Sequence, residues 1–217
     1  MKPETERLTP DADSRGATMP DADNNGTATR DRIIRTAVAL FAQNGYDATG
    51  IAELIAAAGV SRGSFYYHID SKQTLLFLIS KNQVDTMNAV AAPIATSTDS
   101  AADKVRALAR SLIRNIADHQ AEWAVFFRDF FALKGARRQE ILAARDRYEQ
   151  YWLEVLQEGT RRGEFISVTP LLVKGVLGML NYTYLWIDPN GQVSPEELAD
   201  SYTDLLLKGL LRTPGAS

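Results

Sequence analysis

The residues with the clearest binding chemistry lie together between Gly59 and Lys72. This stretch reads Gly-Val-Ser-Arg-Gly-Ser-Phe-Tyr-Tyr-His-Ile-Asp-Ser-Lys. Its hydroxyl, guanidinium, imidazole and ammonium groups are of the kinds that donate hydrogen bonds to phosphate oxygens and to the edges of bases. Gly59 permits a sharp turn, and Ser61 can accept a hydrogen bond from the start of a following helix. The stretch therefore predicts a turn and a short helix that carries nucleic-acid-binding groups.

The apolar residues around this stretch indicate how it is held in place. Ile51, Leu54 and Ile55 recur at helical spacing, and the three alanines that follow them let a second helix cross closely. Within the short helix, Phe65 and Ile69 lie four residues apart and share one face, which we expect to point inward. Two helices joined by a tight turn form a helix–turn–helix, whose second helix fits the major groove of DNA.

The rest of the chain is predicted to be helical, with no convincing strand. A first helix runs from about Thr29 to Asn44 and stops at Gly45, and a long helix begins near Ser71 and ends before Pro93. Five further helical segments follow at about 101–119, 121–133, 135–162, 169–187 and 195–211. With the two helices of the helix–turn–helix, the sequence predicts an all-α protein of nine helices.

Composition and motifs exclude several classes of function. The chain has no cysteine, which rules out disulfides, thiolate metal sites and cysteine nucleophiles. Its two histidines, His68 and His119, do not stand at a metal-ligand spacing, and neither a phosphate-cradling glycine loop nor a serine-nucleophile motif occurs. We therefore expect no catalytic residue, no metal site, no cofactor and no enzymatic activity.

The apolar segments argue against a membrane location. The longest one, residues 171–187, is about 17 residues long, and a bilayer-spanning helix needs roughly 20. The first thirty residues contain no apolar run that could serve as a secretion signal. We expect a cytoplasmic protein, associated with the nucleoid when it is bound to DNA.

Charge and composition separate residues 1–28 from the remainder. These residues hold three basic and six acidic side chains, which account for the whole net charge of −3. They are rich in Pro, Asp, Ser, Thr and Gly and nearly free of large apolar residues, so we expect a disordered acidic tail. A tail that competes with DNA for a basic face is the alternative. Because the remainder is neutral, any phosphate-binding surface must be local.

Residues 29–72 resemble the TetR family of bacterial transcriptional regulators. The pieces that carry the resemblance stand at the family's spacing: Ile33, Ala37, Leu40-Phe41, Gly45-Tyr46, Thr49, the Gly-Val-Ser turn, Tyr-Tyr-His and Ser71-Lys72. The chain departs from the pattern at Gly50, where a Ser or Thr cap is usual, and at Ile55 and Ile69. The resemblance implies a nine-helix TetR-like architecture, with a three-helix DNA-binding domain at 29–73 and a helical ligand-binding and dimerisation domain at 74–217.

The resemblance also implies a double-stranded DNA operator and the residues that bind it. Arg62 and Ser64 are the candidates for base contact, and Tyr66 for contact with a thymine methyl group or a phosphate. The remaining DNA-binding candidates are Thr49, Ser61, Gly63, Tyr67, His68 and Lys72. The alternative is that Tyr66 and Tyr67 are half-buried packing residues and that His68 caps the helix. One such helix reads only a few base pairs, so we expect a homodimer on a near-palindromic site.

Aromatic residues crowd the predicted sixth, seventh and eighth helices. The resemblance implies a pocket for a small-molecule effector here, although aromatic residues at helical spacing also form plain core. The candidates for ligand binding are Trp123, Phe127, Phe130, Phe131, Arg147, Tyr148, Tyr151, Trp152, Tyr182 and Trp186. The last two helices have apolar faces and, at Gly175 and Gly178, room for close approach, so we expect the homodimer to form through them.

The C-terminal half further resembles the TetR branch that senses acyl-CoA esters and controls fatty-acid or sterol-ring breakdown. The matching pieces are residues 145–149, Gly159, Gly163-Glu164-Phe165, residues 178–183, Trp186, Pro189, Gly191 and residues 194–198. This resemblance implies a repressor that an acyl-CoA effector releases from DNA, with arginines of the seventh helix meeting the CoA phosphates. Alternatively, these arginines pair with acidic residues three or four positions away.

Two other functions are compatible with the residues. The first is a repressor of a drug-efflux gene that responds to hydrophobic drugs or dyes. The second is a ligand-binding helical dimer whose DNA-binding module is vestigial.

Overall fold

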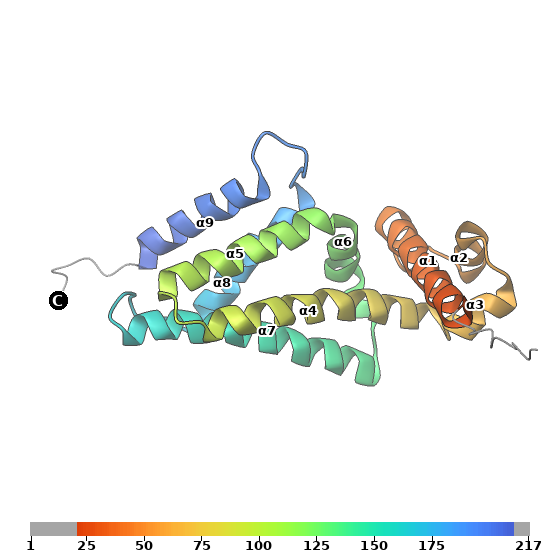
Figure 1. The fold of residues 1–217 in the computed structure, drawn as a ribbon, viewed down its shortest axis with the longest axis horizontal. Helices are drawn as coiled ribbons and strands as arrows, with labels where there is room; N and C mark the ends of the chain where they lie inside the picture. The colour runs from red at the N-terminus through yellow and green to blue at the C-terminus, as the bar shows by residue number, and fades with distance from the viewer. Residues whose placement is uncertain (1–20, 211–217) are drawn as a thin grey trace, which may run out of the picture.

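The structure is a computed structural model that describes the backbone of residues 21–210 and the side chains from residue 26 onward. Within that range the chain forms nine α-helices and two short 3-10 helices and has no strand, which confirms the all-α prediction (Figure 1). The elements are α1 (Asp21–Asn44), α2 (Ile51–Ala58), α3 (Arg62–His68), α4 (Lys72–Thr96), α5 (Ala101–Asp118), α6 (Gln120–Asp129), η1 (Phe130–Ala132), α7 (Gly135–Arg161), α8 (Pro170–Asn181), η2 (Tyr182–Leu185) and α9 (Pro195–Leu210).

Helices α1, α2 and α3 form a small three-helix unit at one end of the molecule (Figure 1). Gly45 and Gly59 stop the first two helices in left-handed conformations, with φ of 89° and 62°, which residues with a Cβ adopt only at a cost. The Ser61 hydroxyl caps α3 by accepting a hydrogen bond from the Ser64 amide at 3.1 Å. Phe65 and Ile69 are fully buried, so the inward face predicted for α3 is confirmed.

Two predicted helix boundaries are wrong. Helix α1 begins at Asp21 rather than near Thr29, so the last eight residues of the expected tail are helical, while residues 1–20 lie outside the described part. Helix α4 continues through Pro93 to Thr96. Pro93 lies in the exposed last turn, where the carbonyl that loses its N–H partner belongs to the exposed residue Ala89 and can bind water instead.

Helix α4 connects the three-helix unit to the larger bundle of α5–α9 (Figure 1). In that bundle α7 runs beneath α4 and packs against it. Buried polar contacts tie these helices together. The Asn88 amide donates to the Ala144 carbonyl oxygen at 2.9 Å, which joins α4 to α7. The ammonium of Lys104 in α5, which is almost completely buried, lies 2.8 Å from Glu158 and 3.2 Å from the Ala95 carbonyl. Glu158 therefore compensates a charge that would be costly to bury alone, and Lys104 lowers the pKa of that carboxyl group.

Helix α9 lies along α5 and is held at its edge by a row of ion pairs. Arg106, Arg110 and Arg114 follow one another at four-residue intervals on α5, and each pairs with an acidic residue of α9: Asp204, Asp200 and Glu196, respectively. The reversed order of the partners shows that the two helices are antiparallel. No helix within residues 21–210 combines the length and apolarity needed to cross a bilayer.

Candidate functional site

Helix α3 presents a row of exposed polar and aromatic side chains. Ser61, Arg62 and Gly63 are exposed at its start, and Tyr67 is 84% exposed. The packing alternative is therefore wrong for Tyr67. Tyr66 is 40% exposed, and the Arg62 guanidinium carbon lies 5.7 Å from the centre of its ring.

The other side chains of the short helix have more limited access to solvent. Ser64 and His68 are half-buried, and the Tyr67 and His68 rings meet edge to face at 4.9 Å. Gly63 has ample room for a Cβ, so packing within the chain does not require a glycine there. The side that faces solvent thus carries a guanidinium, hydroxyl groups and two phenol rings.

Thr49 and Lys72, which the sequence assigns to DNA binding, both make hydrogen bonds within the chain. Thr49 is fully buried, and its hydroxyl donates to the Gly45 carbonyl at 2.8 Å, so it cannot reach a phosphate in this conformation. The Lys72 ammonium donates to the carbonyls of Tyr46 at 2.8 Å and Thr49 at 3.0 Å, and it lies 4.3 Å from the centre of the Tyr46 ring. Both side chains hold the loop between α1 and α2 in place, because they donate hydrogen bonds to backbone carbonyls of that loop.

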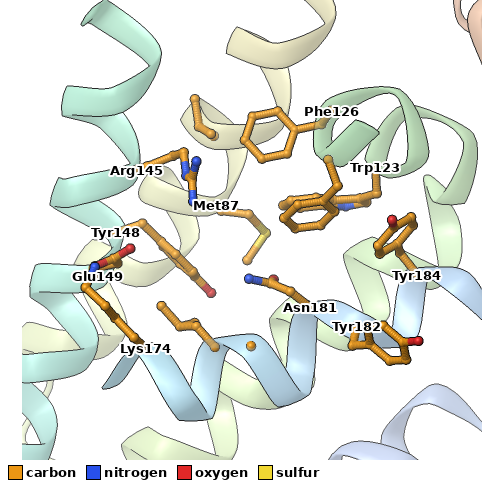
Figure 2. A pocket seen from close by; sticks show the side chains of 14 residues that line it. Met87, Trp123, Phe126, Arg145, Tyr148, Glu149, Lys174, Asn181, Tyr182 and Tyr184 are labelled. Carbon is orange, nitrogen blue, oxygen red and sulfur yellow. The ribbon is translucent and has the colours of Figure 1, made fainter. Parts of the chain in front are cut away.

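A cavity of about 460 Å³ lies in the larger bundle, between α4, α6, α7, α8 and η2 (Figure 2). It is lined by apolar residues of α4 and α8, by an aromatic wall from α6 and η2, and by polar residues of α7 and α8. The lining residues are Val84, Met87, Trp123, Phe126, Phe127, Arg145, Tyr148, Glu149, Lys174, Leu177, Gly178, Asn181, Tyr182 and Tyr184. Among the described residues, no group of histidine and acidic side chains is arranged to hold a metal ion.

Four of the predicted ligand-binding residues line this cavity: Trp123, Phe127, Tyr148 and Tyr182. The six others do not, because helical phase and neighbouring helices turn them elsewhere. Trp152 and Phe130 are buried in the core, Tyr151 packs at its margin, and Arg147 is on the exposed side of α7. Phe131 is 68% exposed and Trp186 is 49% exposed, both outside the cavity lining.

The sequence interpretation included Arg145 among the arginines of the seventh helix expected to meet CoA phosphates, but it did not single out the other charged and amide groups of the cavity, Glu149, Lys174 and Asn181. A signal for them was available. Arg145 and Glu149 stand three residues before and one after Tyr148, so helical spacing puts all three on one face of α7. Lys174 and Asn181 are seven residues apart and share one face of α8.

The charges in the cavity are not balanced. Lys174 and Glu149 form an ion pair at 2.7 Å, and they lie at one side of the cavity (Figure 2). Arg145 has no carboxylate partner among the described residues, and its guanidinium carbon lies 5.9 Å from the centre of the Phe126 ring and 5.5 Å from that of Phe130. The cavity lining therefore carries one uncompensated positive charge, which favours an anionic group in a ligand.

A buried hydroxyl adds a second polar feature. The Tyr148 oxygen is inaccessible to solvent and has no hydrogen-bond partner in the described structure, and burial raises the pKa of this phenol. The neighbouring Trp152 indole opposes that rise in pKa only partly. A phenol held neutral in this way can donate a hydrogen bond if a small rearrangement gives a ligand access to it.

Helix α6 connects the cavity to the three-helix unit. Trp123, which lines the cavity, and Arg128 belong to this one short helix. The Arg128 guanidinium donates to the carbonyl of Phe41 and, at 3.1 Å, to that of Ala42, both in the last turn of α1. The Asp129 carboxylate accepts the Tyr46 amide at 3.3 Å. The end of α1 is thus capped by side chains from a helix that lines the cavity.

Helices α8 and α9 and the short helix η2 expose some large apolar side chains among polar ones. Leu171 and Leu205 are 77% and 66% exposed, and Leu185 is also exposed. Gly175 and Gly178 in α8 have no atom within 4 Å of the position that a Cβ would take, so no contact within the chain requires them to be glycine. Glycine weakens a helix by up to about 1 kcal/mol relative to alanine, so these two positions lower the helix propensity of α8 without a compensating contact in the described structure.

Comparisons with known proteins agree with these features. Residues 33–79 match the family model for bacterial regulatory proteins, tetR family, and residues 98–210 match that for the tetracyclin repressor-like C-terminal domain. The HTH-type transcriptional repressor KstR2 of Mycolicibacterium smegmatis is 22% identical over 200 residues, which cover 90% of this chain and 97% of that protein.

Solved structures resemble the fold over most of its length. The TetR family transcriptional regulator PfmR from Thermus thermophilus superposes with a TM-score of 0.77 at 30% identity, covering 83% of this chain and all of that one. AibR, solved in complex with isovaleryl coenzyme A and operator DNA, superposes with a TM-score of 0.73 at 24% identity, covering 82% of this chain and 97% of that one.

Proposed function

The chain belongs to the TetR family of bacterial regulatory proteins and is a DNA-binding transcriptional regulator, and from this premise we propose that it is a ligand-released repressor. Two copies bind a near-palindromic operator through their α3 helices, and an acyl-CoA ester in the cavity lowers their affinity for it. In this proposal residues 29–73 are the DNA-binding domain and residues 74–217 the ligand-binding and dimerisation domain.

DNA binding is assigned to the exposed side of α3. Arg62 stands at the start of this helix, free of any carboxylate in the described structure, and can donate two hydrogen bonds to a guanine. Ser61, Gly63, Ser64 and Tyr66 share the base-proximal surface. Tyr67 and His68, at the end of the helix, are assigned to the phosphate backbone. Thr49 and Lys72 act indirectly, by positioning the loop before α2.

The homodimer is assigned to α8 and α9. Leu171 of α8 and Leu205 of α9 are exposed apolar side chains that a second copy could bury, and the two unconstrained glycines of α8 let it approach closely. Gly178 also lines the cavity, so one side of the cavity lies against the proposed interface. The row of ion pairs between α5 and α9 would hold α9 in a fixed orientation for pairing.

The uncompensated charge of Arg145 is the observation that supports an acyl-CoA effector. Thioesters of CoA combine an apolar acyl or ring group, which suits the aromatic wall, with phosphates, which suit a free guanidinium. The names of two similar proteins point the same way, because AibR was solved with isovaleryl coenzyme A and the KstR2 of M. tuberculosis is described as a ketosteroid regulator. A hydrophobic cation is disfavoured because the one carboxylate of the cavity, Glu149, is already paired with Lys174.

Release from DNA follows from linkage between the two sites. A ligand that shifts α6 would break the cap that Arg128 and Asp129 place on α1, and the change reaches α3 through the three-helix unit. A hundredfold loss of operator affinity requires about 2.7 kcal/mol of coupling, similar to the loss of one or two charged hydrogen bonds. DNA must weaken ligand binding by the same factor.

A gel-shift assay tests the proposal. The full chain is mixed at low salt with the DNA upstream of its own gene, in the presence of acyl-CoA esters, free CoA or a hydrophobic cation such as rhodamine 6G. Release of a retarded band by acyl-CoA alone is expected. Release by the cation alone would favour the drug-efflux repressor, and no retarded band under any condition would favour a vestigial DNA module.

A further inference from the structure

A phenol and an amide face each other inside the cavity. Tyr148 reaches in from α7 and Asn181 from the end of α8, and Figure 2 shows the Tyr148 hydroxyl and the Asn181 amide pointing toward one another. Only 9% of the Tyr148 surface is exposed, and its oxygen has no hydrogen-bond partner in the described structure. The Asn181 amide forms no hydrogen bond with another described side chain either. The cavity therefore holds two hydrogen-bonding groups that the described part of the chain leaves unpaired.

Packing alone does not account for a phenol at position 148. A buried hydroxyl without a partner loses its hydrogen bonds to water, and phenylalanine would fill the same space without that loss. A second unpaired donor, the indole N–H of Trp152, is buried one turn further along α7. Burial raises the pKa of Tyr148, and the Trp152 indole lies close enough to its oxygen to oppose that rise. Because an indole nitrogen can only donate, the Tyr148 oxygen faces a donor on that side and directs its own proton elsewhere.

The wall across the cavity from Tyr148 is aromatic. The Trp123 and Phe127 rings lie 5.3 Å apart with their planes inclined by only 23°, and the Tyr184 ring continues the wall 5.0 Å from that of Phe127. Figure 2 shows Trp123 and Tyr184 on the opposite side of the cavity from Tyr148. Ring faces of this kind suit a hydrocarbon body. A ligand that packs against them turns its other side toward Tyr148 and Asn181.

We propose that Tyr148 and Asn181 form a polar clamp for an uncharged carbonyl oxygen within the acyl or ring body of the effector. The Tyr148 hydroxyl donates to this oxygen after a small movement of neighbouring side chains, and the Asn181 amide donates a second hydrogen bond from α8. The effector is therefore a keto-acyl ester. A plain hydrocarbon body of the same size leaves both groups unpaired, so the clamp discriminates against it.

The inference rests on the proposed function, because it takes the effector to be a thioester that places its acyl group in this cavity. A volume of about 460 Å³ suits a group of that size. The thioester carbonyl joins the acyl group to the much larger CoA, which puts it at the margin of the cavity. The oxygen that meets Tyr148 and Asn181 is thus a second one, carried by the acyl or ring body itself.

Pairs of CoA esters that differ by one oxygen test the polar clamp. Octanoyl-CoA and cyclohexanepropanoyl-CoA are each compared with esters that carry a ketone at successive positions of the chain or ring. Binding to the full chain is followed by tryptophan fluorescence, to which Trp123 in the cavity contributes. We expect the wild type to bind at least one keto ester about tenfold more tightly than the parent ester.

Tyr148→Phe should abolish this preference and leave the fold intact. The change removes only the hydroxyl, so binding of the keto ester should weaken about tenfold while that of the parent ester changes less than about twofold. The melting temperature should stay the same or rise, because an unpaired buried hydroxyl is removed. Tyr151→Phe, the same change on α7 outside the cavity lining, is the matched control and should alter neither ester. Asn181→Leu, which keeps the bulk of the side chain, should cause the same selective loss.

Other outcomes overturn the inference in different ways. Equal affinities of the wild type for every keto ester and its parent would show that the cavity selects no second oxygen, although the acyl-CoA effector would stand. Equal losses for both kinds of ester in Tyr148→Phe would assign the hydroxyl to the thioester that they share. A less stable Tyr148→Phe with an unchanged keto preference would make the hydroxyl a structural group. Binding of no ester of either kind would overturn the acyl-CoA effector itself, and the clamp with it.

Discussion

The guanidinium of Arg128, in the last turn of α6, donates to the backbone carbonyl of Phe41, in the last turn of α1. These two residues join a helix that lines the cavity to the first helix of the helix–turn–helix unit. The final carbonyls of a helix have no partner within it, so a guanidinium there satisfies hydrogen bonds and interacts well with the negative end of the helix. The contact connects the two halves of the chain independently of the long helix α4.

Replacing Arg128 with Gln should uncouple the two halves. We expect a loss of about 1–2 kcal/mol in the free energy of unfolding, because charged hydrogen bonds to the α1 carbonyls disappear from a partly exposed site. Operator affinity with and without effector should converge, which gel shifts would measure. Arg147→Gln serves as the control because it changes the same charge at an exposed position. An unchanged ratio of the two affinities would place the coupling elsewhere, in α4 or in the contact between Asp129 and the Tyr46 amide.

Replacing Lys72 with Ala should destabilise the DNA-binding unit rather than merely weaken a phosphate contact. The ammonium holds the carbonyls of Tyr46 and Thr49, so its loss frees the loop before α2 and should lower the free energy of unfolding by about 1–3 kcal/mol. Urea unfolding measures this change, and Lys134→Ala, at an exposed lysine, is the matched control. Weaker DNA binding without loss of stability would restore the phosphate role expected from the sequence.

Replacing Arg62 with Ala should relax sequence preference while stability is retained. The side chain is exposed and has no hydrogen bond that holds the fold, so thermal melting should not change. Affinity for the preferred operator should fall by about 1–3 kcal/mol, and affinity for operators altered at the contacted guanine should change little. Gel shifts on a set of single-base operator variants measure the difference. A uniform loss on every DNA would reassign Arg62 to the phosphate backbone.

Replacing Gly159 with Ala should destabilise the larger domain. A Cβ at this position would lie 2.2 Å from a carbon of the Phe165 ring, which is itself buried, so the ring must move. Overpacking of this kind costs about 1–3 kcal/mol, more than the gain in helix propensity from removing a glycine. Gly209→Ala is the control, since nothing lies within 4 Å of its added Cβ. A melting temperature equal to that of the wild type would mean that Phe165 repacks freely.

The features that the sequence predicted correctly are those that neighbouring residues encode. Gly45 and Gly59 mark helix ends because their left-handed conformations disfavour other residues, and Ser61 marks a start because its hydroxyl caps the next helix. The spacing of Phe65 and Ile69 alone gives the buried face of α3. These local rules are sufficient to predict the helix–turn–helix and the all-α class.

Tertiary structure decided which side chains line the cavity. Arg145 and Arg147 are the same type of residue and lie two positions apart on α7. The packing of α4, α6 and α8 against α7 places Arg145 at the cavity and leaves Arg147 in solvent. Likewise, Lys72 meets carbonyls from a loop more than twenty residues earlier in the chain. Helical periodicity defines which residues share a face, whereas the partner of each face depends on contacts between segments far apart in sequence, which no local pattern contains.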